Sequence, residues 1–431
     1  MLDVREKPRM VERAFLVGVH LRKESADEAD DLLRELHELV ATLGIQVVWS
    51  TRVEIRKWHP RLLMGTGRAE ELLEAVRATD ADCIVFDNEL TPAQQRHWED
   101  FADVCVIDRQ EVILDIFATR AQTREAQLQV ELARTEYNLP RLKRAWTHLG
   151  RQGGGGRESA AHRGEGEQQI EVDRRMVRRK ISTLKKELAA IRKHRATQRK
   201  DRVRVPIPHA AVVGYTNAGK SSLVTALSGS EIYVADKLFA TLDTTTRRIR
   251  LPNGRPLLVT DTVGFVRRLP HDLVESFKAT LEEAVLADFV VHILDVTAPQ
   301  VDAFHRTTMD VLKELGADDK MMLTVFNKTD LLRSDQPTVP SLRQRYPDAV
   351  FVSAKTGDGL DALEERMADA LADQVEDVEL LVPYDRTDVV AMLHDLGEVR
   401  STDYVDDGIR IAVTLSHRVA DQCKEWRPAS G

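Results

Sequence analysis

The stretch GYTNAGKS, residues 214–221, limits the possible folds of this chain more than any other segment. Its spacing, one glycine followed after four residues by Gly219, Lys220 and Ser221, is that of a phosphate-binding loop. Such a loop joins a buried strand to a helix. The apolar residues before it fit the strand, and the run SSLVTAL after it fits the helix. Backbone N–H groups at the helix N-terminus would then surround phosphates, Lys220 would reach the β/γ-phosphates, and the Ser221 hydroxyl would bind Mg²⁺. We therefore expect an α/β domain with a phosphate site.

Alternating strand and helix patterns occupy three parts of the chain. Residues 1–108 contain the strand runs AFLVGVH, IQVVWS, DCIVFD and VCVID around the amphipathic ADEADDLLRELHELVATL, which predicts a small α/β domain with parallel pairing. Residues 205–373 contain LLVTD, FVVHILDV, MMLTVFNK and AVFVSAK, which predict a mostly parallel sheet. Residues 374–431 read as a further small α/β domain.

The segment 109–204 is helical and basic. One helical pattern runs from about Arg109 to Trp146 with an interruption near Pro140, and another runs from about Gln168 to Arg202. Their joint, GRQGGGGRESAAHRGEGEQ, contains four consecutive glycines that oppose regular structure. Between residues 120 and 204 there are 23 Lys and Arg against 10 Asp and Glu, so this block carries +13 and the rest −21 of a total of −8. We expect a helical hairpin with a basic tip that contacts a polyanion, although a solvated face is the alternative.

The composition fits a soluble protein of several domains. The 431 residues are 42% hydrophobic and 31% charged, without an apolar run of about 18 residues or more. The charged start MLDVREKPRMVERAF lacks the apolar core of a signal peptide. Three cysteines cannot form a disulfide framework, and Cys83 and Cys105 lie in short apolar runs typical of buried strands. We expect a monomeric, cytoplasmic protein without a membrane span.

Further motifs follow the loop in the order of a guanine-nucleotide site. Asp261 ends the run LLVTD, where it could hold Mg²⁺ through water, and Gly264 in DTVGF offers a backbone N–H to the γ-phosphate. In NKTD, the Asp330 carboxylate would accept from the guanine N1–H and 2-amino group, a donor pair that adenine lacks. Asn327 and Lys328 would support the base and its loop, and SAK at 353–355 would lie on the O6 side.

These motifs resemble those of a known family. GYTNAGKSSL, LFATLDTTTR, DTVGFV, NKTD and SAKTGDG, together with LDIFATRAQTREAQLQVELA, LGRQGGGG and GEQQIEVDRR, make nearly the whole chain similar to the HflX family of ribosome-associated GTPases, in the Obg-like class. The resemblance implies GTP hydrolysis, binding to the large ribosomal subunit and its RNA, and splitting or rescue of ribosomes under stress. It also implies that Thr241 is the switch threonine that closes on Mg²⁺, and that the N-terminal domain is a candidate ATP site.

The motifs and the resemblance together define three sets of expected site residues. Catalysis is expected from Lys220, Thr241 and Gly264, and metal binding from Ser221, Thr241 and Asp261. The expected nucleotide site comprises Gly214, Tyr215, Thr216, Asn217, Ala218, Gly219, Lys220, Ser221, Ser222, Phe239, Asp261, Gly264, Asn327, Lys328, Asp330, Ser353, Ala354 and Lys355. The expected ribosomal RNA contacts are Arg151, Arg157, Arg163, Arg174, Arg175, Arg178 and Arg179.

The chain departs from common GTPase patterns at several positions. Phe265 stands where many GTPases have a Gln that orients the attacking water, so we expect slow intrinsic hydrolysis and alignment from another switch residue, a cation or the ribosome. Asn217 is typical of GTPases that place K⁺ against the developing charge, which makes K⁺ a second candidate ion, although an Asn that caps its own loop is equally expected. GEGEQQIE replaces the family's usual GPGETQLE and follows a longer loop, and Thr244 replaces the usual Pro in LDTTTR. The family's contacts at these two loops are therefore not assigned to this chain.

Two other functions stay open at this point. One is a GTP-regulated switch on a protein partner, and the other is an RNA-remodelling ATPase with a regulatory GTPase domain. GTGR at 65–68 could form a second phosphate site or a structural turn. Trp146 and His148 could stack on RNA bases, or Trp146 could pack between helices.

Overall fold

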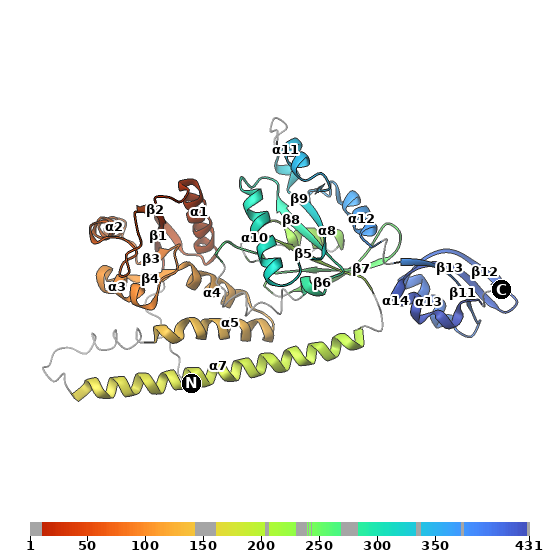
Figure 1. The fold of residues 1–431 in the computed structure, drawn as a ribbon, viewed down its shortest axis with the longest axis horizontal. Helices are drawn as coiled ribbons and strands as arrows, with labels where there is room; N and C mark the ends of the chain where they lie inside the picture. The colour runs from red at the N-terminus through yellow and green to blue at the C-terminus, as the bar shows by residue number, and fades with distance from the viewer. Residues whose placement is uncertain are drawn as a thin grey trace. The chain divides into compact units, whose positions relative to one another are not determined.

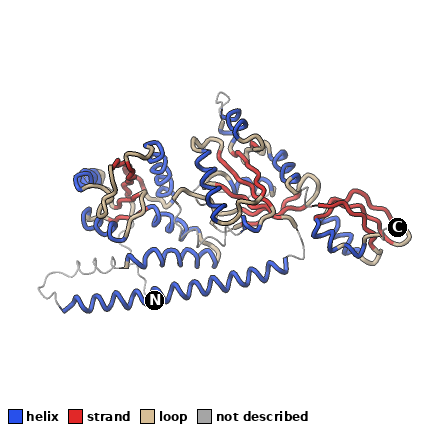
Figure 2. The backbone as a smooth tube through the Cα atoms, in the orientation of Figure 1, coloured by secondary structure: helices blue, strands red, loops and turns tan. Residues whose placement is uncertain are grey.

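The computed structural model describes residues 11–142, 161–202, 207–229, 239, 241–242, 244–268, 283–332, 338–371 and 375–428. They divide into two compact units. The first extends to residue 191 and includes Arg267 and Arg268, and the second contains the other described residues. Three separate sheets are visible as red groups in Figure 2, and the mixed α/β class expected from the sequence is confirmed. The four-domain division at residues 108/109, 204/205 and 373/374 remains a prediction.

The first sheet is parallel throughout, as predicted, with strand order β2-β1-β3-β4 (Figure 1). Its core includes Phe15, Phe86 and Trp98, all fully buried. Cys83 is buried beside the partly exposed Cys105 on the neighbouring strand, and both are free thiols. The elements are β1 (Arg13–Leu21), α1 (Ala26–Thr42), β2 (Gln46–Ile55), α2 (Thr66–Ala78), β3 (Cys83–Phe86), α3 (Pro92–Ala102) and β4 (Cys105–Asp108).

A chain of ion pairs lies at the carboxyl ends of β3 and β4, with Arg109, Glu35 and Asp87 buried and Arg268 exposed. The Arg109 guanidinium pairs with Glu35 at 2.5 Å and with Asp87 at 2.7 Å. The remaining oxygens of these carboxylates pair with Arg267 at 3.1 Å and Arg268 at 2.7 Å. Buried charges require such paired partners, because an unpaired ion loses its hydration without compensation.

The helical region differs from the sequence expectation. The α-helix is interrupted near Pro140, as expected, but the pattern from Arg109 already breaks after residue 120, which was not expected. Ala121 is extended, and the Thr123 side chain accepts from the Ala126 N–H, which starts a new helix. The second helix begins at Ala161 rather than Gln168, so part of the predicted glycine-rich joint is helical. The elements are α4 (Arg109–Arg120), α5 (Arg124–Asn138), the 3₁₀ turn η1 (Leu139–Arg141) and α7 (Ala161–Arg202).

Helices α5 and α7 pack as the antiparallel pair expected of a hairpin. Arg124 near the start of α5 pairs with Glu187 of α7, whereas Glu131 further along α5 pairs with the earlier Lys180. Leucines of both helices form a common apolar cluster, which supplies the hydrophobic stabilisation that an isolated helix lacks. The buried members are Leu128, Leu132, Leu184 and Leu188.

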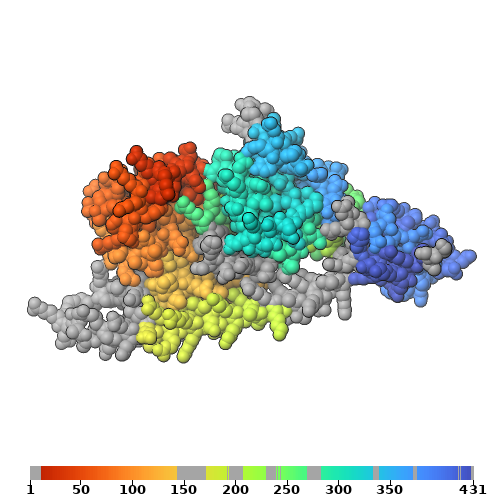
Figure 3. Space-filling view, viewed as in Figure 1, coloured from red at the N-terminus to blue at the C-terminus, as the bar shows by residue number. Residues whose placement is uncertain are grey.

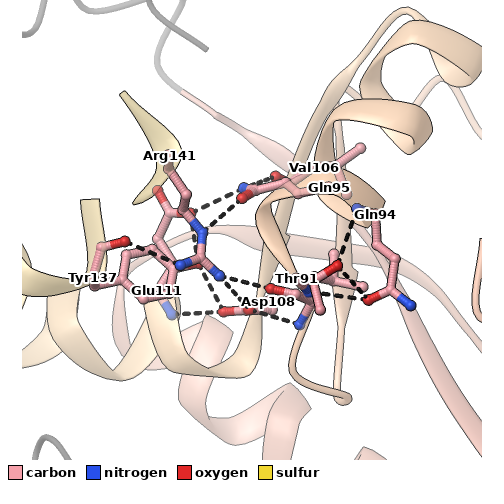
Figure 4. A network of polar contacts seen from close by, with 9 residues as sticks. Thr91, Gln94, Gln95, Val106, Asp108, Glu111, Tyr137 and Arg141 are labelled. Carbon is pink, nitrogen blue, oxygen red and sulfur yellow. Dashed lines mark hydrogen bonds and ion pairs between the residues drawn. The ribbon is translucent and has the colours of Figure 1, made fainter. Parts of the chain in front are cut away.

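A buried polar network fixes the end of α5 to the first sheet (Figure 4). The Tyr137 hydroxyl donates to Asp108 at 3.1 Å, and Arg141 donates to Gln95 at 3.0 Å while its guanidinium covers the Tyr137 ring. Burial raises the pKa of Asp108, while hydrogen bonds and the Arg141 charge oppose the rise. Burial likewise raises the pKa of Tyr137, so its hydroxyl remains a donor. The network holds the point from which the chain enters the predicted basic tip.

The second sheet has strand order β10-β9-β8-β5-β7-β6. Its first five strands are parallel, as predicted, and β6 is an antiparallel edge strand that the sequence did not indicate. The strands are β5 (His209–Gly214), β6 (Thr245–Arg250), β7 (Pro256–Asp261), β8 (Phe289–Asp295), β9 (Met321–Asn327) and β10 (Val350–Phe351). The helical elements are α8 (Lys220–Leu227), α10 (Val301–Glu314), η2 (Thr329–Leu331), α11 (Thr338–Arg345) and α12 (Leu360–Asp369).

The third sheet is small and antiparallel, with order β11-β13-β12. The strand β12 had no counterpart in the sequence expectation. The elements are β11 (Val375–Val382), α13 (Thr387–Leu396), β12 (Glu398–Val405), β13 (Gly408–Ser416), α14 (His417–Gln422) and η4 (Lys424–Trp426). Across the described segments, no helix combines the length and apolar character that crossing a bilayer requires.

Candidate active site

The phosphate loop lies where the sequence placed it, between β5 and α8. Gly219 has φ +92°, and a Cβ there would meet the Asn327 amide nitrogen at 2.2 Å. Only glycine therefore allows the loop to approach the strand end that carries Asn327. Asn217 is also left-handed, with φ +61°, and is exposed. The loop residues Tyr215, Thr216 and Ala218 are buried, whereas Ser222 is partly exposed.

Lys220 folds back over this loop. Its buried ammonium donates to the Tyr215 carbonyl at 2.9 Å and to the Gly214 carbonyl at 3.2 Å. Burial lowers the pKa of Lys220 to about 8, and the charge of Asp261 opposes that shift. The group is thus a desolvated cation at the loop, placed to interact with phosphate.

The three predicted metal ligands converge. Ser221 Oγ lies 2.6 Å from Thr241 Oγ1 and 2.6 Å from Asp261 Oδ2, which also accepts from Thr241 at 2.8 Å. Burial raises the pKa of Asp261, while Lys220 and the two hydroxyls oppose the rise. Asp261 Oδ1 is buried and has no hydrogen-bond partner among the described residues. This all-oxygen set, with one unsatisfied carboxylate oxygen, fits a hard divalent cation such as Mg²⁺.

The base-recognition motifs also come together. Asn327 donates to the Ala218 carbonyl at 2.9 Å and accepts from the Ala354 N–H at 3.0 Å, so it ties the phosphate loop to SAK. Ser353 Oγ donates to Asp330 Oδ1 at 2.7 Å, which orients an otherwise exposed carboxylate. Lys328 pairs with Asp295 at 2.8 Å. Asp295 was missed in the sequence, although its place at the end of β8, opposite Asn327 in register, was the available signal.

The DTVGF turn is bonded directly to the phosphate loop, which no sequence pattern indicated. The Thr216 N–H donates to the Phe265 carbonyl at 2.8 Å, and the Phe265 N–H donates to the Gly214 carbonyl at 3.0 Å. A Cβ on Gly264 would lie 2.7 Å from Thr216 Cγ2 and 2.9 Å from Lys220 Nζ. Phe265 itself is 3% exposed. An apolar, buried side chain therefore occupies the position from which a Gln would orient water.

Two further predicted nucleotide contacts, Phe239 and Lys355, are among the described residues. Phe239 is buried in a left-handed conformation, with φ +53°, and Lys355 is exposed. GTGR forms the start of α2, where a Cβ on Gly65 or Gly67 would meet nothing within 4 Å. No neighbouring atom therefore requires glycine at these two positions. An ATP site in this part of the chain remains a prediction.

Four of the predicted RNA contacts form what we call the α7 arginine row. Arg175, Arg178 and Arg179 are exposed, and Arg174 is partly exposed. Within the described part of the chain, none of the four has an ion-pair partner. Figure 3 shows the described side chains of α7 as a yellow-green band. Arg163 lies in α7 without a described side chain, and Arg151, Arg157, Trp146 and His148 lie outside the described residues.

Beneath the phosphate loop, His292 is a fully buried histidine on β8. It lies in register with Val213, its ring stacks on His305 at 5.1 Å, and its Nε2 has no partner among the described residues. Burial lowers the pKa of His292 to about 3, with smaller contributions from the charges of His305 and Lys220. The folded protein therefore holds this ring neutral.

The His292 environment should make stability depend on pH. A depressed histidine pKa means that the unfolded chain binds the proton more readily, so stability is complete above about pH 6.5 and is lost as pH falls toward 3. Between pH 7 and 5 this group should remove about 2 kcal/mol from the free energy of unfolding. Denaturant titrations of the wild type and of His292→Phe should show that loss in the wild type alone. Equal losses in both proteins would contradict the assignment.

Comparison with known proteins gives matches along most of the chain. Family models match as GTP-binding GTPase N-terminal over residues 30–118, GTP-binding GTPase Middle Region over 120–202, and 50S ribosome-binding GTPase over 209–328. The chain is 50% identical over 422 residues to the GTPase HflX of Akkermansia muciniphila, covering 96% of this chain and 97% of that one. The GTPase HflX of Escherichia coli is 37% identical over 416 residues, covering 96% and 95%. A GTP-binding protein from the archaeon Sulfolobus solfataricus, solved with GDP, is 22% identical with a TM-score of 0.42, covering 84% and 99%.

Proposed function

Because the chain belongs to the HflX family and is a GTP hydrolase, we propose that it binds the large ribosomal subunit and dissociates or rescues ribosomes, with stress as the expected setting. The α7 arginine row carries the proposal. Four neighbouring arginines without ion-pair partners among the described residues offer their charge to an external polyanion. Ribosomal RNA supplies such phosphates, and a nucleic-acid partner explains the row better than a protein switch or a solvated face does.

The proposed nucleotide roles follow from the site geometry. Lys220 would contact the β/γ-phosphates, and Ser221, Thr241 and Asp261 would hold Mg²⁺ directly or through water. Mg²⁺, when bound, would neutralise charge on the β- and γ-phosphates. The Asp330 carboxylate, oriented by Ser353, would select guanine. The Gly264 N–H would contact the γ-phosphate.

Slow intrinsic hydrolysis is part of the proposal. Phe265 contributes no hydrogen-bonding side chain, and both of its backbone groups are bonded to the phosphate loop. Water alignment therefore needs other groups, and we expect contact with the large subunit to complete it. Stimulated turnover would then link GTP hydrolysis to the ribosome-bound state.

A direct test uses intact ribosomes. Adding the protein with a non-hydrolysable GTP analogue should convert ribosomes into subunits on a sucrose gradient, with the protein in the large-subunit fraction. The same mixture with GDP should split fewer ribosomes. Intact ribosomes in both mixtures, with no bound protein, would contradict the proposal.

Asn217 leads to a prediction about monovalent ions. If its exposed side chain helps to seat K⁺ against the phosphates, the cation would offset charge that develops during hydrolysis. GTP turnover should then be several-fold faster in KCl than in NaCl at equal ionic strength, and Asn217→Ala should remove the difference. Equal turnover of the wild type in both salts would leave Asn217 as a loop-capping residue.

A further inference from the structure

The hydroxyl of Thr216 is a buried polar group without a partner. The residue is 6% exposed, and its Oγ1 has no hydrogen-bond partner in the part of the chain that the structure describes. Its backbone N–H, in contrast, donates to the Phe265 carbonyl at 2.8 Å. Buried hydroxyls are normally hydrogen-bonded, because leaving one unpaired costs free energy. An orphan hydroxyl inside a nucleotide site therefore indicates a partner that arrives with the ligand.

Thr216 lies at the γ-phosphate end of the site. A Cβ on Gly264 would meet Thr216 Cγ2 at 2.7 Å, Thr216 Cα at 2.8 Å and Lys220 Nζ at 2.9 Å, so these three residues converge on one point. Lys220 and Gly264 are the groups expected to contact the γ-phosphate. A change of staggered rotamer exchanges Cγ2 and Oγ1 of a threonine, so the hydroxyl can take the position of the methyl group.

The neighbouring hydroxyl groups and the Phe265 N–H already have hydrogen-bond partners. Thr241 is bonded to Ser221 and Asp261, and the Thr262 hydroxyl donates to the Val212 carbonyl at 2.8 Å. Phe265 offers no polar side-chain atom, and its N–H donates to Gly214. Thr216 thus brings a hydroxyl with both donor and acceptor capacity to a place where the expected Gln is missing.

We propose that Thr216 is a positioning residue for GTP hydrolysis. In the GTP-bound protein its hydroxyl accepts a hydrogen bond from the attacking water and donates one to a γ-phosphate oxygen. The water oxygen forms the new bond to phosphorus, and the bond between phosphorus and the β–γ bridging oxygen breaks with its electron pair remaining on GDP. The water proton passes to the phosphate released. Thr216 gains and loses no proton in this step; it orients the nucleophile that Phe265 cannot orient.

The test compares two substitutions that separate the hydroxyl from the shape of the side chain. Thr216→Val retains the branched shape and removes the hydroxyl, whereas Thr216→Ser retains the hydroxyl. Single-turnover hydrolysis of GTP, with saturating protein in excess and without ribosomes, should be about 10- to 100-fold slower in the Val variant. This is the effect of one lost hydrogen bond to a charged group. The Ser variant should remain within about threefold of the wild type, and the GDP affinity of both should change by less than about threefold.

Three results would overturn the proposal. They are wild-type hydrolysis by the Val variant, equally slow hydrolysis by the Ser variant, and a loss of GDP affinity in the Val variant that matches its loss of rate. The last two would mean that Thr216 only shapes the loop. Melting temperatures verify folding, and if Thr216→Val does not fold, Thr216→Ala takes its place in the comparison with Ser. Because ribosomes are absent, failure here would leave the proposed ribosomal function untouched.

Discussion

Reversing the charge of the α7 arginine row is expected to abolish the stimulation of GTP hydrolysis by large ribosomal subunits while the intrinsic rate persists. Each contact to a phosphate releases counterions, so affinity should depend on salt with a slope of roughly −0.7 to −0.9 per contact. Four contacts would then weaken binding by about 50- to 150-fold between 50 and 200 mM salt. Turnover with and without large subunits measures the effect of the combined change Arg174→Glu, Arg175→Glu, Arg178→Glu and Arg179→Glu.

A control of equal charge separates a local surface from a general electrostatic effect. Lys23, Arg56, Lys57 and Arg61 are exposed in the same compact unit, and changing all four to glutamate alters the net charge by the same amount. This control should keep most of the stimulation, because these residues lie outside α7. Full stimulation of the α7 variant would show that the hairpin is a scaffold and that the ribosome is contacted elsewhere. Adding Phe265→Gln to the α7 variant should not restore stimulation, because a Gln alone lacks the surrounding alignment.

Apolar side chains beside the arginine row strengthen this prediction. Val172 and Met176 are each 43% exposed on the same helix, one turn apart. Leu184 and Leu188, further along α7, are buried against α5. The exposed part of α7 thus combines cations with accessible apolar groups, a composition suited to a binding surface.

Asp330→Asn is expected to lower the affinity for GTP by about 100-fold or more. The carboxylate would accept two hydrogen bonds from guanine, and each bond to a charged group contributes about 1.5–3 kcal/mol. An amide that presents its NH₂ group would instead oppose the guanine donors and match the C2 oxygen of xanthine. Titration with GTP and with xanthosine triphosphate should therefore show the preference reversed in the variant.

The SAKTGDG segment, whose Ser353 is bonded to Asp330, provides a matched control for Asp330. Asp358 is another exposed carboxylate, held by Thr356 Oγ1 at 2.7 Å, and is not expected to contact the base. Asp358→Asn should change GTP affinity by less than about threefold. If Asp330→Asn also left GTP affinity unchanged, NKTD would have no place in the base site.

The sequence by itself determined the nucleotide chemistry of this protein. The phosphate loop, Asp261, NKTD and SAK are short contiguous motifs at strand ends, and parallel strands bring their carboxyl ends to one edge of a sheet. Residues far apart in the chain, such as Ser221 and Asp261, were therefore expected to meet, and they do at 2.6 Å. The glycines of the phosphate loop and the alternation of strand and helix patterns likewise predicted the α/β fold around the site.

Only the tertiary structure decided the features that depend on unrelated segments meeting. The helix break after residue 120, the edge strands β6 and β12, and the network of Asp108, Tyr137 and Arg141 have weak local signals. The same holds for the bonds between the DTVGF turn and the phosphate loop, and for the Thr216 hydroxyl, which has no partner among the described residues. Hydrogen-bond pairing between distant residues and the burial of polar atoms are properties of the packed chain. A linear pattern can specify which groups are present, but packing decides which of them remain without a partner.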